Sequence, residues 1–168
     1  MKLHHYKVCV EWEGNLGKGT QSYSAYSRNF LVKSDDHDSA ISGSADPAFR
    51  GDAKRWNPEE LLLAATSACH KLWYLHLCAV NGISVVSYED TCEAAMEEGH
   101  GDKEGRIVSI TLAPTILVDE KSDTSLAMKL HEDAHKACFI ANSLNFPVQC
   151  KATILVEGHQ TRPEDTPR

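Results

Sequence analysis

Residues 57–82 read "NPEELLLAATSACHKLWYLHLCAVNG", and this stretch constrains the fold more than any other part of the chain. Asn57 is a good N-cap, the proline after it suits the first helical position, and Glu60 stands where a capping-box acid reaches back. The apolar pattern runs to about Val80, after which Gly82 supplies a left-handed stop. The sequence therefore predicts one long helix with sharp ends.

This predicted helix has no charged residue between Glu60 and Lys71, and it is apolar around most of its circumference. A single small sheet cannot cover a helix on several sides. We therefore expect a dimer that wraps both copies of it. Cys69 lies among small residues in the middle of the helix, where a purely structural core would favour Leu or Ile.

The rest of the chain predicts strands and a second helix. Alternation and β-branched content predict extended runs, turn residues separate them, and a second amphipathic run follows an Asp-Thr cap. The expected elements are strands at 4–12, 21–33, 83–96, 106–118 and 148–157, a long loop at 33–56, a helix at about 123–145, and a frayed tail at 158–168. Strands and helices do not alternate strictly, so the order favours an α+β sheet packed on two helices in a single domain, residues 1–157.

Charge and hydropathy exclude two classes of partner. The chain of 168 residues has 17 Lys and Arg against 24 Asp and Glu, a net charge of −7, with no basic run. Phosphate contacts dominate nucleic-acid affinity, so we expect no nucleic-acid partner. No stretch approaches the roughly 18 apolar residues of a membrane span, and the start lacks an apolar signal. We expect no membrane partner and a cytoplasmic protein.

Six cysteines are scattered through the predicted elements, and no CxxC occurs. A reducing cytosol disfavours structural disulfides, so most of the six are expected to be small buried hydrophobes and a minority reactive. On helical wheels Cys69 and Cys138 both lie among small side chains, whereas Cys78 points away from Cys69. If two cysteines meet, Cys69 and Cys138 are the best-placed pair. Two buried structural thiols remain the alternative.

A zinc site is another alternative. His131, His135 and Cys138 have i, i+4, i+7 spacing on one helical face. With Cys69 or His70 they would supply the four ligands of a tetrahedral zinc site.

Three motifs resemble those of the OsmC/Ohr family of thiol-dependent peroxidases: "NPEELLLAATSAC", "AHKACFIANSLNFPV" and the turn "GNLGKGT". The resemblance covers nearly the whole chain, and "DPAFRGDAKRWNPEEL" and "WYLHLC" are most similar to a less characterised OsmC-like branch. It implies an intertwined homodimer with antiparallel sheets packed on two long central helices. It also implies an enzyme that reduces organic hydroperoxides, with hydrogen peroxide a poorer substrate in the Ohr group, and without a bound cofactor or metal.

The resemblance also assigns roles to residues. Cys69 matches the peroxidatic cysteine, and Cys138 matches the resolving one. Glu59 matches the carboxylate that holds the catalytic arginine. Arg50 stands close to where the OsmC branch places that arginine, and Arg28 is the alternative.

The chain departs from the family pattern at three positions. The turn that carries the Ohr-type arginine offers only Lys18. His70 stands where an aromatic or apolar residue is usual, and Phe139 where proline is common. These differences bear on substrate and rate more than on the class of chemistry.

The chemistry that these residues support is peroxide reduction by a thiolate, which an arginine beside it would favour. The resulting sulfenic acid at Cys69 would condense with Cys138, and an external dithiol would reduce the disulfide. In some family members that reductant is a lipoylated protein. The aromatic residues near the motifs are either ordinary core or the lining of the site, in which case they favour an apolar hydroperoxide: Trp56, Trp73, Phe139 and Phe146. A non-enzymatic module that binds a small apolar ligand on the same fold remains the competing function, and a helix-based zinc protein the third.

Helix geometry adds a prediction about the dimer. Glu59 and Cys69 are ten residues apart on one helix, which corresponds to about 15 Å. An arginine held by Glu59 would not reach Cys69 of the same chain, but an antiparallel crossing near Ala64 would bring Glu59 of the partner to it. We therefore expect two sites at the dimer interface, with Cys138 from the same chain as its Cys69.

Overall fold

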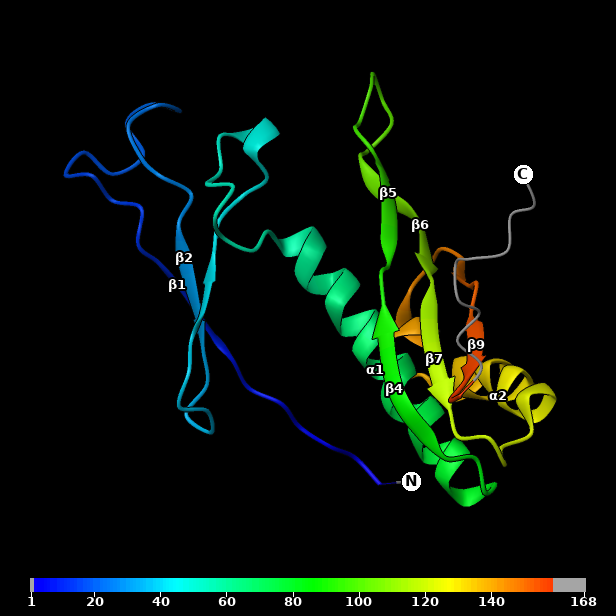
Figure 1. The fold of residues 1–168 in the computed structure, drawn as a ribbon. Coiled ribbons are helices and arrows are strands. Elements are labelled where there is room, and N and C mark those ends of the chain that lie inside the picture. The colour runs from blue at the N-terminus through cyan, green and yellow to red at the C-terminus, as the bar shows by residue number, and fades with distance from the viewer. Residues whose placement is uncertain (1, 159–168) are drawn as a thin grey trace, which may run out of the picture. The chain divides into compact units, whose positions relative to one another are not determined.

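The computed structural model describes residues 2–158 (Figure 1). The backbone divides into two compact units, residues 1–62 and the chain from residue 63 onward. Each unit is described by itself. The tail expected at 158–168 lies, apart from Gly158, outside the described residues, and the grouping of residues 1–157 into one domain stays a prediction.

The first unit is built on a three-stranded antiparallel sheet in the order β1-β2-β3. Its strands are β1 (Cys9–Trp12), β2 (Phe30–Lys33) and β3 (Ile41–Gly43). The first two are shorter than the runs expected at 4–12 and 21–33. The expected loop at 33–56 is not structureless, because β3 pairs with β2 and a 3₁₀ helix, η1 (Pro47–Phe49), follows it.

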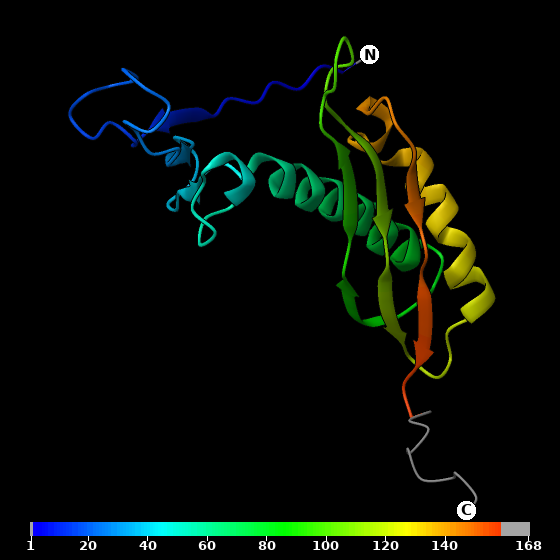
Figure 2. The same cartoon turned by 90° about the horizontal axis from the view of Figure 1, so that it is seen from above.

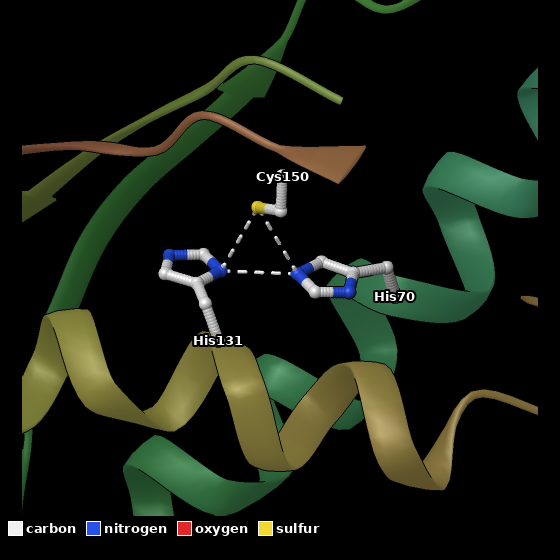
Figure 3. Close-up of side chains that lie close together, drawn as sticks. All are labelled: His70, His131 and Cys150. Carbon is white, nitrogen blue, oxygen red and sulfur yellow. Dashed lines mark hydrogen bonds between the residues drawn. The ribbon is translucent and has the colours of Figure 1, made fainter. Parts of the chain in front are cut away.

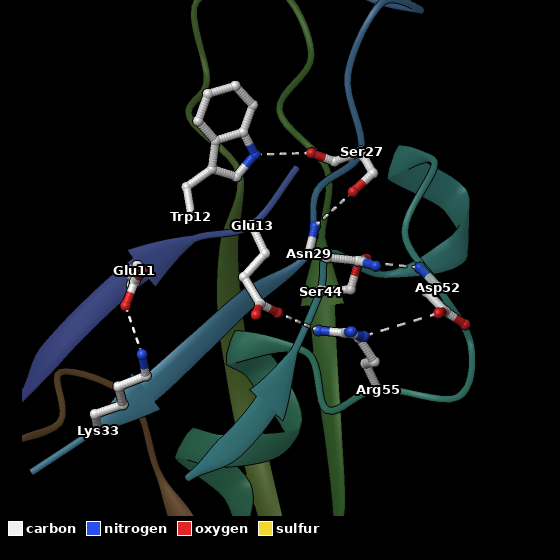
Figure 4. A network of polar contacts seen from close by, with 9 residues as sticks. All are labelled: Glu11, Trp12, Glu13, Ser27, Asn29, Lys33, Ser44, Asp52 and Arg55. Atoms are coloured by element: carbon white, nitrogen blue, oxygen red, sulfur yellow. Dashed lines mark hydrogen bonds and ion pairs between the residues drawn. The ribbon is translucent and has the colours of Figure 1, made fainter. Parts of the chain in front are cut away.

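Polar contacts tie this segment to the sheet (Figure 4). The buried Ser44 hydroxyl donates to the side-chain oxygen of Asn29 at 3.0 Å and accepts from the backbone N–H of Asp52 at 3.0 Å. Arg55 reaches Glu13 at 3.1 Å. Buried polar groups need partners, so this short network supplies the order that hydrophobic periodicity did not predict.

The long helix forms as expected. Helix α1 is Pro58–Val80, and its capping box is complete: the backbone N–H of Asn57 donates to the Glu60 carboxylate at 3.0 Å, and that of Glu60 donates to the Asn57 side chain at 2.7 Å. At the other end Gly82 has φ +75°, and the N–H of Ile83 donates to the carbonyl of Cys78 at 2.9 Å. Local sequence is sufficient for both ends because each cap lies within a few residues of its partner.

The second unit has two three-stranded sheets, β4-β7-β9 and β5-β6-β8. The strands are β4 (Val85–Asp90), β5 (Glu93–Glu97), β6 (Arg106–Leu112), β7 (Pro114–Val118), β8 (Val148–Cys150) and β9 (Thr153–Val156). Each of the three strands expected here is thus divided in two. The break between β4 and β5 contacts the break between β6 and β7, because the Asp90 carboxylate accepts a hydrogen bond from the backbone N–H of Ala113 at 2.8 Å.

The second helix, α2 (Thr124–Ala137), connects β7 to β8, and β8 and β9 pair in parallel with β6 and β7. The two sheets of this unit are therefore mixed and not antiparallel throughout, as the resemblance had implied, because the helical connection returns the chain in the same direction. Asp123 caps it, as expected, by accepting from the N–H groups of Ser125 and Leu126. The expected end at about 145 is wrong: the helix ends at Ala137, and Cys138 is its extended C-cap. The chain then makes only a 3₁₀ turn, η2 (Ala141–Ser143), because Cys138 leaves the helical conformation.

Both helices pack on the buried side of β7, and Figures 1 and 2 show them alongside these strands. The core contains residues from α1, β7 and α2, together with the turn after α1: Tyr74, Cys78, Ile83, Ile116, Val118, Ala127, Leu130 and Ala134. Alternate residues of β7 are buried, the period of a strand with one face toward a core. This shared core fixes the positions of α1 and α2 along the strands.

The faces of α1 differ sharply. The side toward the core is lined by Thr66, His70, Tyr74 and Cys78. The opposite side is exposed within this chain although it is mostly apolar, with Ala64, Ala65, Ala68, Leu72 and Ala79. Among the described residues, no helix is both long enough and apolar enough to cross a membrane.

Candidate active site

Two free thiols meet where α1 passes the end of α2. Cys69 is a partly buried residue of α1, and Cys138 is the fully buried C-cap of α2. The two side chains are neighbours, because Cys69 is among the groups that raise the pKa of Cys138. The backbone N–H of Ala141 also points to the Cys138 sulfur, at 3.4 Å. The early end of α2 thus holds this thiol toward α1.

The two thiols are not equivalent. Burial, followed by the interaction with Cys69, raises the pKa of the Cys138 thiol above its ordinary value. Cys138 therefore keeps its proton near neutral pH. Because only the thiolate attacks peroxides efficiently, Cys69 is the better candidate for the attacking residue of the pair.

An aromatic pair lies next to the thiols. Trp73 is one helical turn after Cys69, and Phe139 directly follows Cys138. Their rings make an edge-to-face contact with centroids 5.8 Å apart. Phe139 is 71% exposed, so it is not ordinary core, and an apolar surface borders the pair. Trp56, in the other unit, is exposed as well.

The remaining cysteines are arranged differently. Cys78 is buried in the core, where burial raises its pKa, and Cys9 is exposed on β1. Burial likewise raises the pKa of Cys92, which lies between β4 and β5. Thiols whose pKa is raised by burial, here Cys78 and Cys92, are poor nucleophiles at neutral pH.

The two candidate arginines lie in the first unit. Arg28 donates to the carbonyls of Tyr26 and Tyr23 at 2.7 and 2.6 Å, and its guanidinium stacks on both rings at 4.3 and 4.2 Å. Arg50 has a left-handed backbone, φ +65°, and its guanidinium lies 5.4 Å from the Tyr23 ring. Arg28 directs two of its donors to its own loop, whereas in residues 2–158 no carboxylate pairs with Arg50.

Glu59 is in the first turn of α1, and it likewise forms no ion pair with any described residue. Its neighbour Glu60 is occupied by the capping box. The roles of Glu59 and Arg50 therefore stay predictions, and both groups are available to a partner. Lys18 is exposed in the turn held by Asn15, whose side chain accepts from Gly17 and Gly19.

A second cluster was not foreseen as a unit. His70 of α1, His131 of α2 and Cys150 of β8 converge in the second unit (Figure 3). His70 Nε2 lies 3.0 Å from His131 Nδ1, and the Cys150 sulfur lies 3.7 Å from each of these nitrogens. Within the described part of the chain this is the one group of three or more His, Cys, Asp or Glu with the spacing of metal ligands.

The cluster changes the expected zinc ligands. His131 and His70 meet, but His135 and Cys138 are not part of the group, and Cys69 faces Cys138 instead. The end of α2 at Ala137 is the reason, because it removes Cys138 from the helical face of His131. The unusual His70 was the signal available in the sequence. Nothing in the pattern pointed to Cys150, which is 80 residues away.

The two histidines of the cluster are shielded from water, and Cys150 is partly buried. His70 and His131 are 1% and 5% exposed, and burial lowers the pKa of both, that of His131 to about 4. Burial also raises the pKa of Cys150 to about 11. At neutral pH the free cluster therefore contains two neutral imidazoles and a thiol.

Comparison with known proteins agrees with this architecture. The sequence matches the family model described as OsmC-like protein over residues 51–153. The chain belongs to the OsmC-like family. A search of curated proteins finds no significant match.

Solved structures extend the likeness to most of the chain. An OsmC-like protein of unknown function from Vibrio cholerae is 26% identical, with a TM-score of 0.78 over 90% of this chain and 100% of the other. An organic hydroperoxide resistance protein OsmC from Legionella pneumophila is 21% identical, with a TM-score of 0.64 over 92% and 100%. The organic hydroperoxide resistance protein OhrB of Bacillus subtilis is 20% identical, with a TM-score of 0.58 over 89% and 98%. The OsmC-like α+β fold expected from the sequence is confirmed.

Proposed function

We propose that this chain is a cysteine-based peroxidase that reduces organic hydroperoxides. The observation that carries the proposal is that Cys69 and Cys138, both free thiols, are neighbours in a chain of the OsmC-like family. The names of the Legionella and Bacillus structures, both organic hydroperoxide resistance proteins, support the same class. Six free thiols also suit a reducing compartment, and we propose the cytoplasm.

In the first step the Cys69 thiolate attacks the terminal oxygen of the hydroperoxide. The S–O bond forms as the O–O bond breaks, and the leaving alkoxide takes a proton to become an alcohol. Cys69 is thereby oxidised to the sulfenic acid. The neighbouring Cys138 favours this assignment, because burial raises its pKa, so it stays protonated and is suited to the resolving role.

In the second step the Cys138 sulfur attacks the sulfenic sulfur. A disulfide forms and water leaves, so the two sulfurs together have lost two electrons and the peroxide has gained them. An external dithiol, for which a lipoylated protein is our candidate, then exchanges with the disulfide and restores both thiols. The reaction needs no bound cofactor.

The substrate is expected to be apolar. Trp73 and Phe139 present an aromatic surface next to the thiol pair, and Phe139 is largely exposed. An alkyl or aryl hydroperoxide would bury part of its apolar area there, at about 25 cal/mol per Å². Hydrogen peroxide gains nothing from that surface.

Activation is proposed to come from Arg50 and from Glu59 of the partner in a homodimer. Helix α1 is continuous from Pro58 to Val80, and its exposed apolar face of small residues is suited to a close helix crossing. An arginine held in plane by a carboxylate stabilises charge on the departing oxygen better than a lysine does. Arg28 is the alternative arginine.

The first test is a titration of the reduced, metal-free protein with an organic hydroperoxide, followed by thiol counting and mass mapping. We expect the loss of two thiols per chain and a Cys69–Cys138 disulfide. Unchanged thiols would favour the competing ligand-binding module. A disulfide through Cys78 or Cys92 would contradict the pairing.

A second test addresses the shared site. Cys69→Ser and Glu59→Ala subunits, each inactive alone, are mixed and allowed to exchange. Random pairing gives heterodimers with one intact site, so about a quarter of the wild-type activity should return. A fully active monomer, or no recovery in mixtures shown to contain heterodimers, would rule the arrangement out.

A further inference from the structure

We propose that His70 Nε2, His131 Nδ1 and the Cys150 sulfur form a zinc-binding site separate from the Cys69–Cys138 pair. The site goes beyond the peroxidase proposal, because none of its three ligands takes part in that reaction.

The spacing is that of a tetrahedral zinc site before the ion enters. The three separations are 3.0, 3.7 and 3.7 Å. Zinc bonds of about 2.0 Å to nitrogen and about 2.3 Å to sulfur, at tetrahedral angles, give separations of about 3.3, 3.6 and 3.6 Å. The centre of the observed triangle lies about 2.0 Å from each corner. Shifts of a few tenths of an ångström would accommodate the ion.

The three side chains come from different elements and point toward one another (Figure 3). The ring of His131 is stacked on the ring of Tyr74, with centroids 3.9 Å apart and planes 10° apart. The rings of His70 and His131 are parallel within 4°. Packing therefore fixes both imidazoles in the core, which lowers the ordering cost of binding an ion.

Hydrogen bonding leaves the free cluster incomplete. The facing nitrogens of His70 and His131 share a single proton, so one ring donates and the other accepts. In the described residues the outer nitrogens, His70 Nδ1 and His131 Nε2, have no partner. Zinc would take both inner lone pairs at once, and the shared proton would move to the outer nitrogen of the ring that donated it.

Charge also favours a cation. Burial is the main cause of the lowered pKa of His70 and the raised pKa of Cys150, and the negative charge of the Asp90 carboxylate also acts on both groups. Its oxygens are engaged by Ser67 and by the backbone of Ala113. Asp90 thus affects the cluster electrostatically without being a ligand. A water molecule would take the fourth coordination position of the zinc ion.

The ligand set selects the type of ion. Two imidazoles and a thiolate suit zinc and its analogue cobalt, whereas magnesium and calcium require oxygen ligands. Binding converts the Cys150 thiol to a thiolate and releases its proton to solvent, so affinity falls as the pH falls. The bound ion would link β8 to α1 and α2, the two helices that carry the thiol pair.

The experiment uses full-length protein that has been reduced and treated with a chelator. Cobalt(II) is added first, because a cobalt–thiolate bond absorbs in the near ultraviolet and four-coordinate cobalt has intense visible bands. Zinc affinity is then measured by competition with a chromophoric chelator. The variants are Cys150→Ser and His131→Gln, with Cys92→Ser as the matched cysteine control. The Cys69→Ser, Cys138→Ser double variant isolates the cluster from the thiol pair.

We expect one cobalt ion per chain with thiolate absorption in the wild type, in Cys92→Ser and in the double variant. Cys150→Ser should lose that absorption, and both ligand variants should bind zinc at least about tenfold more weakly. Circular dichroism identifies a variant that fails to fold, and the double variant still decides the question by itself. Absence of thiolate absorption in the wild type, or its disappearance in the double variant alone, would overturn the proposal. Either result leaves the peroxidase test independent, because that test is done without metal.

Discussion

Cys69 and His70 are neighbours in α1, yet they belong to two different sulfur-containing clusters. Cys69 is partly buried, meets a second thiol and lies near an exposed aromatic ring. His70 is 1% exposed and meets a second imidazole and the Cys150 thiol. One residue along a helix is a rotation of about 100°, which is enough to move from the border of the core to its interior.

The comparison shows that the neighbours of a thiol decide its chemistry. In the pair, burial keeps Cys138 protonated beside Cys69, and we propose that it traps the oxidised form of Cys69. In the triad, burial holds Cys150 as a thiol and both histidines as neutral rings, a state suited to ligation rather than to nucleophilic attack. The following predictions separate the two.

The largest effect is expected from Cys69→Ser. Loss of the attacking sulfur should lower peroxide consumption by at least about a thousandfold. Peroxide removal is followed with an organic hydroperoxide and excess dithiol. Cys92→Ser, a partly buried cysteine outside both clusters, should retain wild-type activity. Turnover by Cys69→Ser would refute the distinction drawn between the two clusters.

Cys138→Ser should separate the two steps of the proposed reaction. With peroxide alone the variant should complete about one turnover per chain and stop, because the sulfenic acid has no resolving thiol. A carbon nucleophile specific for sulfenic acids should label Cys69, as detected by mass spectrometry. Labelling of Cys150 instead would show that the reactive thiol belongs to the triad and would contradict the proposed role of Cys69.

Arg50→Ala should slow the reaction of the pair with peroxide by about tenfold to a hundredfold, since it removes the positive charge that stabilises the developing oxyanion. Stopped-flow measurement of the first step detects this. The cobalt spectrum of the triad should not change. If Arg28→Ala is slow and Arg50→Ala is normal, the role moves to Arg28.

The smallest effect concerns stability and is confined to the triad. Free zinc at roughly 100 times its dissociation constant should raise the free energy of unfolding by about 2.7 kcal/mol. Urea denaturation with and without zinc measures this gain. At the same zinc concentration Cys150→Ser should show at most about 1.4 kcal/mol of this gain, as expected for an affinity at least tenfold lower, and Cys92→Ser should show all of it. Equal gains in all three proteins would place the ion elsewhere.

The sequence alone predicted the features that depend on short-range contacts. The ends of α1 and the start of α2 are correct because Asn57, Glu60, Gly82 and Asp123 each act within a few residues of themselves. The α+β fold also followed, since the order of strands and helices limits the possible layers. Helical periodicity brought Cys69 and Cys138 forward as the pair best placed to meet.

Tertiary structure decided the rest, because the deciding contacts join distant parts of the chain. The strand interruptions depend on contacts such as that between Asp90 and Ala113, 23 residues apart. The histidine–cysteine triad joins residues separated by 61, 19 and 80 positions. No local period encodes such separations. Sequence thus determined which side chains each element presents. Only packing decided that His70 faces Cys150 rather than Cys138, because α2 ends at Ala137 and Cys138 does not continue the helical face of His131.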